Sequence, residues 1–135
     1  GPTGRGEIDA RARACLEGIG EWMRRHHRSI HGCGPAPDDL VAPADCHYTY
    51  NAETNRLYLH LFAWPFSAVH LPGLAGRVKY AQLLHDASEI TYRDASAAIH
   101  TGLSDRSGAG EITLHLPVVK PDVEIPVVEL FLDTI

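Results

Sequence analysis

The hydrophobic pattern of this chain changes its period along the sequence. Over residues 9–28 the apolar positions recur at steps of three and four, which predicts an amphipathic helix. The apolar stripe consists of Ala12, Cys15, Leu16, Ile19, Trp22, Met23 and His26. Gly18 and Gly20 lower the helix propensity, so we expect this helix to depend on packing against a partner surface. Because Cys15 lies on the stripe, we expect its thiol to be buried.

Beyond residue 45 the pattern has a period of two, which indicates β-strands. The longest run is Arg56–Trp64, with aliphatic side chains on one face and mostly aromatic ones on the other. The two sets are Leu57, Leu59, Leu61 and Ala63, and Tyr58, His60, Phe62 and Trp64. Pro65 ends the run because proline cannot donate a ladder hydrogen bond. Since both faces are apolar, we expect one to fill a core and the other to pack against the preceding helix or another domain.

Shorter runs with turn signals between them complete the pattern. They are Cys46–Tyr50, Ala68–Leu71, Arg77–His85, Glu89–Arg93, Ala97–His100, Glu111–Leu116 and Val123–Leu132. The polar residues 51–55 join the first run to Arg56–Trp64 as a hairpin, and residues 101–110 read as a loop. Seven or eight short strands predict a mainly β protein, an antiparallel β-sandwich preceded by one α-helix. Gly32–Pro43, with three prolines, is the best boundary candidate.

Length and charge narrow the class of protein. A chain of 135 residues fits one domain, or one domain with part of another. The net charge of −5 argues against a nucleic-acid partner, and we expect Arg24, Arg25 and Arg28 to stabilise a helix C-terminus instead. No apolar stretch approaches the ~20 residues that span a bilayer, so we expect no membrane partner. Residues 1–14 have no apolar core typical of a signal peptide, and the cellular location stays open.

An ordered series of short motifs runs through nearly the whole chain. The motifs are GPTGRGEI at 1–8, LEGIGEWM at 16–23, SIHGC at 29–33, LYLHLFAWP at 57–65, VHLPGLAGRVKYAQLL at 69–84, ITLHLP at 112–117 and PDVEIPVVEL at 121–130. This series resembles the C-terminal region of the family 29 glycoside hydrolases, the α-L-fucosidases. The sequence departs from the family at residues 26–28, where His-His-Arg replaces the usual Asn-Gly-Glu, and at residues 91–110, which are longer than the usual turn.

The resemblance implies a division of the chain and an activity of the whole protein. Residues 1–32 would be the loop and last helix of a catalytic (β/α)8-like barrel, 33–45 a linker, and 46–135 the C-terminal β-sandwich domain. Such a protein hydrolyses terminal α-L-fucosyl linkages with retention. The catalytic carboxylates of the family lie upstream of Gly1, so this chain alone is expected to be inactive.

The resemblance also implies partners. The first is the catalytic barrel of the same protein, and the second is a fucosylated glycan. Without the barrel, the apolar stripe of the helix is expected to favour self-association. The alternative function is a free-standing carbohydrate-binding or interaction module with a β-sandwich fold.

We expect no catalytic residue, cofactor site or metal site within the chain itself. A retaining glycosidase needs two carboxyl groups about 5–5.5 Å apart, whereas most carboxylates here fall in predicted loops or at strand ends. They are Asp38, Asp39, Asp45, Asp86, Glu89, Asp94, Asp105 and Glu111.

Two further sets of residues have competing interpretations. His27 and His31, with Cys33 nearby, have a spacing that metal ligands use, but no second ligand pair follows, which favours a structural role. Cys33 and Cys46 are able to pair in an oxidising compartment, although the sequence does not require it. The aromatic face of Arg56–Trp64 offers rings for stacking on sugars, and packing against protein is the favoured interpretation.

Overall fold

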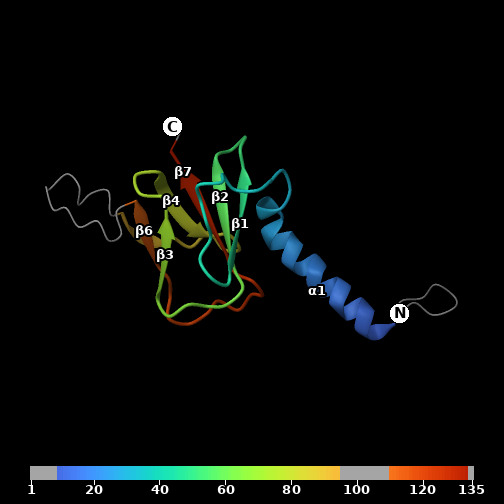
Figure 1. Ribbon diagram of the computed structural model, residues 1–135. Helices are drawn as coiled ribbons and strands as arrows, with labels where there is room; N and C mark the ends of the chain where they lie inside the picture. Colours follow the sequence, from blue (N-terminus) through green and yellow to red (C-terminus); the bar gives the residue numbers. More distant parts are fainter. Residues whose placement is uncertain (1–8, 95–109, 134–135) are drawn as a thin grey trace, which may run out of the picture.

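The computed structural model describes residues 9–94 and 110–133, in which one helix is followed by strands in two sheets (Figure 1). The elements are α1 (Ala10–His26), the 3-10 helix η1 (His27–Ser29), β1 (Cys46–Asn51), β2 (Arg56–Leu61), β3 (Ala68–Pro72), β4 (Val78–Leu83), β5 (Thr91–Asp94), β6 (Glu111–His115) and β7 (Val127–Leu132). The strand orders are β1-β2-β7-β4 and β3-β6-β5, and all pairs are antiparallel. The predicted β-sandwich preceded by one α-helix is therefore confirmed.

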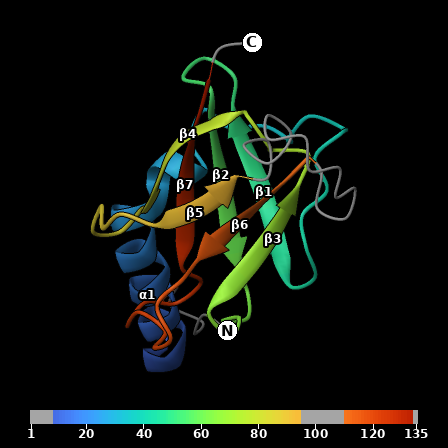
Figure 2. The ribbon, with the colours of Figure 1, turned by 90° about the vertical axis from the view of Figure 1, so that its left-hand side faces the viewer.

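The core lies between the two sheets, which face each other in Figure 2. Leu57, Leu59 and Leu61 of β2 all point into it and are at most 1% exposed. Because side chains alternate along a strand, Tyr58 and His60 lie on the outer face of the four-stranded sheet. The prediction that one face of this strand fills the core is confirmed.

The hairpin β1–β2 is held at its turn by Asn51. Its side-chain Oδ1 accepts hydrogen bonds from the backbone N–H of Glu53 at 3.0 Å and of Thr54 at 3.2 Å. Asn55 adopts a positive φ of 54°, which asparagine tolerates better than most residues. The predicted hairpin is confirmed, because the register pairs Cys46 with Leu61 and Asn51 with Arg56.

The sheet ends earlier than the sequence pattern predicts. β2 stops at Leu61 rather than Trp64, and the backbone N–H of Phe62 donates instead to the carbonyl oxygen of Asp45, just before β1. The predicted last strand is also shorter, because β7 begins only after Pro126. The predicted strand at 97–100 lies outside the described residues, as do residues 1–8 and 101–109.

Helix α1 begins at a capping aspartate and lies on the outer side of the four-stranded sheet (Figure 1). The Asp9 carboxylate accepts a hydrogen bond from the N–H of Ala12 at 2.8 Å, as an N-cap does. Only the C-terminal part of α1 reaches the sheet, and Leu16 and Ile19 are 54% and 55% exposed. The expectation that Cys15 is buried is wrong: its thiol is exposed, because this part of the helix projects away from the sandwich. No described helix is long and apolar enough to cross a membrane.

Candidate functional site

Buried polar and charged side chains of the described residues lie at the outer face of the four-stranded sheet; they include His26, His60 and Glu129. Tyr58, Leu84 and Val127 form a small buried cluster on this face, against which Trp22 of α1 packs. The indole N–H of Trp22 reaches the carbonyl oxygens of Glu124 at 2.7 Å and Ile125 at 3.3 Å. The predicted second role of β2, packing against the preceding helix, is therefore what Tyr58 does.

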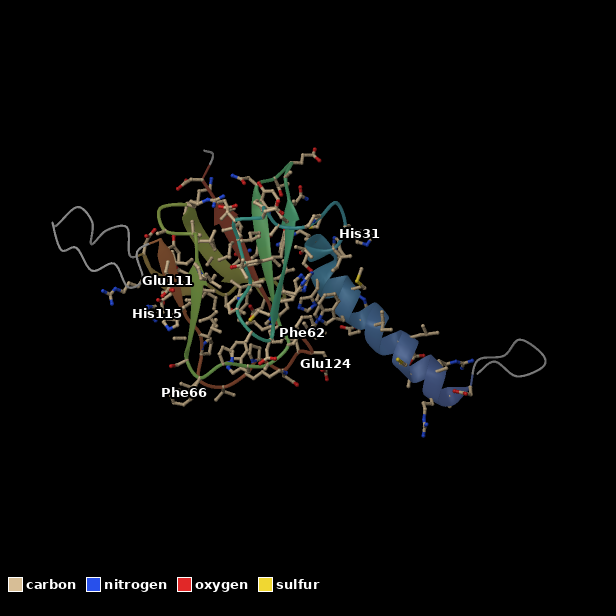
Figure 3. The ribbon with its side chains drawn as sticks, viewed as in Figure 1. His31, Phe62, Phe66, Glu111, His115 and Glu124 are labelled. Carbon is tan, nitrogen blue, oxygen red and sulfur yellow. The ribbon has the colours of Figure 1, made fainter. Side chains whose placement is uncertain are left out.

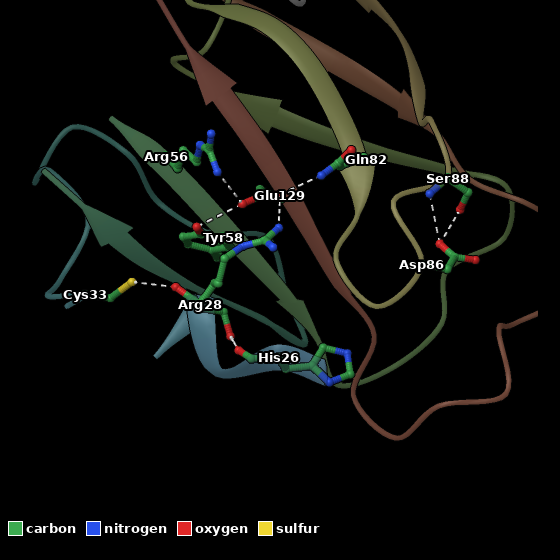
Figure 4. A network of polar contacts seen from close by, with 10 residues as sticks. His26, Arg28, Cys33, Arg56, Tyr58, Gln82, Asp86, Ser88 and Glu129 are labelled. Atoms are coloured by element: carbon green, nitrogen blue, oxygen red, sulfur yellow. Dashed lines mark hydrogen bonds and ion pairs between the residues drawn. The ribbon is translucent and has the colours of Figure 1, made fainter. Parts of the chain in front are cut away.

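At the centre of this face lies a fully buried carboxylate, Glu129 of β7 (Figure 4). Its Oε1 accepts hydrogen bonds from Nη2 of Arg28 at 2.8 Å and from Nε2 of Gln82 at 2.7 Å. Its Oε2 accepts from the Tyr58 hydroxyl at 3.0 Å and from Nη1 of Arg56 at 3.3 Å. A buried charge is tolerated only when it is paired and hydrogen-bonded, and these four donors meet that requirement. We call these five residues the Glu129 cluster.

Two donors of the Glu129 cluster, Arg28 and Tyr58, have raised pKa values. Partial burial by itself would lower the pKa of Arg28, but the hydrogen bond and charge of Glu129 raise it above its ordinary value. Burial, followed by the negative charge of Glu129, raises the pKa of Tyr58 to about 12. The Tyr58 hydroxyl thus keeps its proton at neutral pH and donates it to the carboxylate. Because Arg28 belongs to η1, the cluster fastens the end of the helical segment to the sheet.

Two histidines lie against Trp22 beside the Glu129 cluster, and two more lie against those histidines. The ring of His26 stacks on the Trp22 indole with centroids 4.4 Å apart, and His60 lies 6.3 Å from the same indole. The ring centroid of His85 lies 6.2 Å from that of His26, and the His47 centroid 6.3 Å from that of His60. Burial is the main reason that the pKa of His26 is lowered and that the pKa of His60 falls to about 4. Both imidazoles are therefore neutral at neutral pH.

The described carboxylates that the sequence singled out either have ordinary structural partners or are exposed to solvent. Asp39 pairs with Arg77 at 3.1 Å, and Asp94 accepts a hydrogen bond from the N–H of Gly76 at 2.8 Å. Asp86 accepts from both the backbone and the hydroxyl of Ser88. Asp38, Asp45 and Glu89 are exposed, and Glu111 lies 3.4 Å from His70. Asp105 lies outside the described residues. That the chain holds no catalytic dyad stays a prediction.

The residues with metal-like spacing meet only in part. The rings of His27 and His31 lie edge to face with centroids 6.0 Å apart, while the Cys33 thiol donates to the Arg28 carbonyl oxygen at 3.4 Å. Within residues 9–94 and 110–133 no three His, Cys, Asp or Glu side chains form a group able to hold a metal ion. Cys33 and Cys46 are free thiols in this structure.

The aromatic side chains expected on one face of Arg56–Trp64 separate. Tyr58 faces α1, whereas Trp64, beyond the end of β2, packs against the sandwich core and donates its indole N–H to the Pro117 carbonyl oxygen at 3.0 Å. Phe62 and Phe66, both labelled in Figure 3, are 60% and 88% exposed. A shallow groove of about 410 Å³ borders Trp64. The expected shared aromatic face therefore does not form, because the strand ends before Phe62.

Sequence reasoning missed Glu129, the residue that organises this face. The signal was present: Glu129 is the one charged residue within the six residues of β7, VVELFL, at a position flanked by apolar neighbours. A lone acid inside a buried strand requires partners, and the sequence supplies Arg56 and Tyr58 on the strand that pairs with β7.

No family profile and no curated protein sequence matches this chain. Solved structures do match it. α-L-Fucosidase isoenzyme 1 from Paenibacillus thiaminolyticus is 31% identical, with a TM-score of 0.79 over 99% of this chain and 30% of that protein. A GH29 α-L-fucosidase from Bacteroides thetaiotaomicron is 21% identical, with a TM-score of 0.75 over 98% of this chain and 27% of its own. An α-fucosidase from Thermotoga maritima is 17% identical, with a TM-score of 0.69 over 96% and 29% of the two chains.

This chain spans less than a third of the length of each of these fucosidases. Since the three matches cover 99%, 98% and 96% of this chain, they include both the helix and the sandwich. The sequence resemblance is thus confirmed: over its whole length, this chain has the structure of a region that makes up about 30% of a family 29 α-L-fucosidase.

Proposed function

We propose that this chain is the C-terminal region of an α-L-fucosidase-like glycoside hydrolase and serves as its structural support. In this proposal the whole protein hydrolyses terminal α-L-fucosyl linkages, and the chain contributes no catalytic residue. Residues 1–32 end the catalytic barrel, 33–45 link it to the sandwich, and 46–135 form the sandwich. The observation that carries the proposal is the match to the Paenibacillus enzyme, at 31% identity and a TM-score of 0.79 over 99% of this chain.

The surface of α1 supports the proposal. Its C-terminal turn is fastened to the sheet through Trp22 and His26, whereas Leu16 and Ile19, earlier on the same stripe, are more than half exposed. Helices of this length are marginal in water unless an apolar face is packed. A catalytic barrel seated on Leu16 and Ile19 would supply that packing, and α1 would then lie between the barrel and the sandwich.

The proposal predicts that the chain by itself is inert. With p-nitrophenyl α-L-fucoside as substrate, we expect release of p-nitrophenol at the uncatalysed rate, because a retaining mechanism needs a nucleophile and an acid/base within about 5–5.5 Å of each other. The matched control is the Paenibacillus enzyme under the same conditions. Turnover by the purified chain above the buffer rate would contradict the assignment of a purely supporting role.

A second candidate function is carbohydrate binding, favoured by the exposed rings of Phe62 and Phe66, which flank in sequence the residues 63–65 that line the groove. Aromatic faces stack on sugar rings, and such a platform would direct the hydrolase to fucosylated glycans. Titration of the chain with fucosylated oligosaccharides tests this function. Binding that is lost in both Trp64→Ala and Phe66→Ala, with the fold retained, would establish it, and absence of binding by the parent chain would exclude it.

A further inference from the structure

Four imidazoles and one indole meet between α1 and the outer face of the four-stranded sheet. His26 comes from α1, His47 from β1, His60 from β2 and His85 from the residues after β4, and they surround Trp22. His26 and His60 are 1% and 5% exposed. We call these five residues the histidine cluster. It forms part of the contact of α1 with the sheet, beside the apolar packing of Trp22 on Tyr58, Leu84 and Val127, while the Glu129 cluster holds η1.

The lowered pKa values of His26 and His60 make both buried imidazoles neutral at neutral pH, and the hydrogen bonds assign the single proton of each ring. Nδ1 of His26 donates to the Trp22 carbonyl oxygen at 2.8 Å, which leaves Nε2 as the unprotonated nitrogen. That Nε2 is buried and has no partner. The Thr49 hydroxyl donates its single hydrogen to the Ser29 carbonyl oxygen, so Nε2 of His60, 3.1 Å from the same hydroxyl, is the donor there. A proton added to His26 would thus sit on a buried nitrogen that has no acceptor.

Charged groups of both signs lie near the histidine cluster. On α1, Arg25 disfavours a charged His26 and is itself paired with Glu21 at 3.4 Å. On the sheet side, His47 faces His60 and His85 faces His26. Asp86 is a nearby carboxylate, 3.5 Å from Nε2 of His85. From the loop before β7, Asp122 and Glu124 line a pocket beside Trp22 and His26, and Glu124 also accepts the indole N–H of Trp22 at its backbone carbonyl. A proton added to His26 would therefore be buried without a hydrogen-bond acceptor of its own, near the positive charge of Arg25.

We propose that the histidine cluster is an acid-sensitive latch, and that its protonation releases α1 from the sheet while η1 stays attached through Arg28 and Glu129. The docked helix requires neutral rings at His26 and His60, whereas the released helix leaves these two rings free to take up protons from water. Arg28 stays charged throughout, so the bond between η1 and β7 survives and the helix pivots after His26. This inference concerns the chain itself and does not depend on the proposed function.

The direction of the pH dependence follows from proton binding. Burial, with the nearby His47 and His26, lowers the pKa of His60 from 6.5 to about 4 in the docked state. The docked state therefore binds fewer protons than the released state, and docking is favoured above the ordinary histidine pKa and lost as the pH falls below it. Release is expected between about pH 4 and pH 6.5, in the interval between these two pKa values.

Trp22 reports the release directly. In a Trp64→Phe background Trp22 is the only tryptophan of the chain. We expect its emission to shift to longer wavelength in this pH interval, while the amides of β2 and β7 keep their protection from hydrogen exchange. If the emission does not change between pH 7 and pH 4, or if sheet protection is lost in the same transition, the latch does not exist.

Variants separate the histidine cluster from general effects of acid. His26→Phe keeps a ring to stack on Trp22 and removes one titrating group, so the transition should become shallower by about one proton. His60→Gln, which keeps a hydrogen-bond donor toward Thr49, should do the same and serves if the first variant fails to fold. The control is His70→Gln on β3, where the imidazole is 62% exposed and should leave the transition unchanged. Equal slopes in the parent, both cluster variants and the control would overturn the inference.

Discussion

Replacing Glu129 with alanine is expected to lower the free energy of unfolding by about 3 kcal/mol. The substitution removes the acceptor of four hydrogen bonds and leaves the buried hydroxyl of Tyr58 and the amide of Gln82 without a partner. Breaking a buried ion pair from one side costs about 3–5 kcal/mol. The lower end applies here, because the side chains of Arg28 and Arg56 are 49% and 35% exposed and regain water.

Urea unfolding of the parent, Glu129→Ala and Glu129→Gln measures this effect. We expect Glu129→Gln to lose about half as much, because its amide oxygen still accepts while its NH₂ group faces other donors. Glu111→Gln is the matched control, since its ion-pair partner His70 is largely exposed, and its change should stay within about 0.5 kcal/mol. If Glu129→Ala is no less stable than this control, the Glu129 cluster does not hold the helical segment to the sheet.

The double substitution Leu16→Lys and Ile19→Lys is expected to abolish self-association of the chain. These side chains are 54% and 55% exposed on the projecting half of α1, and an apolar surface of this kind drives association in concentrated solution. Adding positive charges to both copies opposes their contact, so the dissociation constant should rise at least about tenfold, which corresponds to about 1.4 kcal/mol.

Sedimentation equilibrium over a wide concentration range checks this prediction. Ala14→Lys, on a different side of the helix and also exposed, is the matched control and should associate like the parent. The free energy of unfolding of the monomer should hardly change in either variant, because neither site contacts the sandwich. A parent chain that stays monomeric at the highest concentration would show that α1 needs no partner at this surface.

The β-sandwich fold could be predicted from local sequence patterns, whereas the Glu129 cluster could not. The alternation of Leu57, Leu59 and Leu61 with Tyr58 and His60 specifies a strand with two buried faces, and the structure confirms both. Glu129 was missed because its ion-pair partners Arg28 and Arg56 lie 101 and 73 residues away, so only the tertiary fold brings them together.

Two expectations, the burial of Cys15 and the extension of the strand to Trp64, were wrong because hydrophobic periodicity does not encode the contacts that decide them. The stripe that contains Cys15 correctly defines one side of α1, but it does not say how far along the helix the sheet reaches. The alternation continues through Trp64, but Asp45, which lies opposite Phe62 in the register and accepts its N–H, has a φ of 60° and no longer continues β1 as an extended strand. Neighbouring elements, rather than the hydrophobic pattern of one segment, determine which helix residues are buried and where a strand ends.

The central claim, that this chain is the supporting region of an α-L-fucosidase, is tested most directly by exchange. The matching region of the Paenibacillus enzyme, about 30% of that protein, is replaced by this chain, and hydrolysis of p-nitrophenyl α-L-fucoside is compared with a version that lacks the region. We predict that the version without the region loses activity and stability, and that the exchanged protein recovers both. A folded exchanged protein with no turnover, or full activity without the region, would contradict the claim.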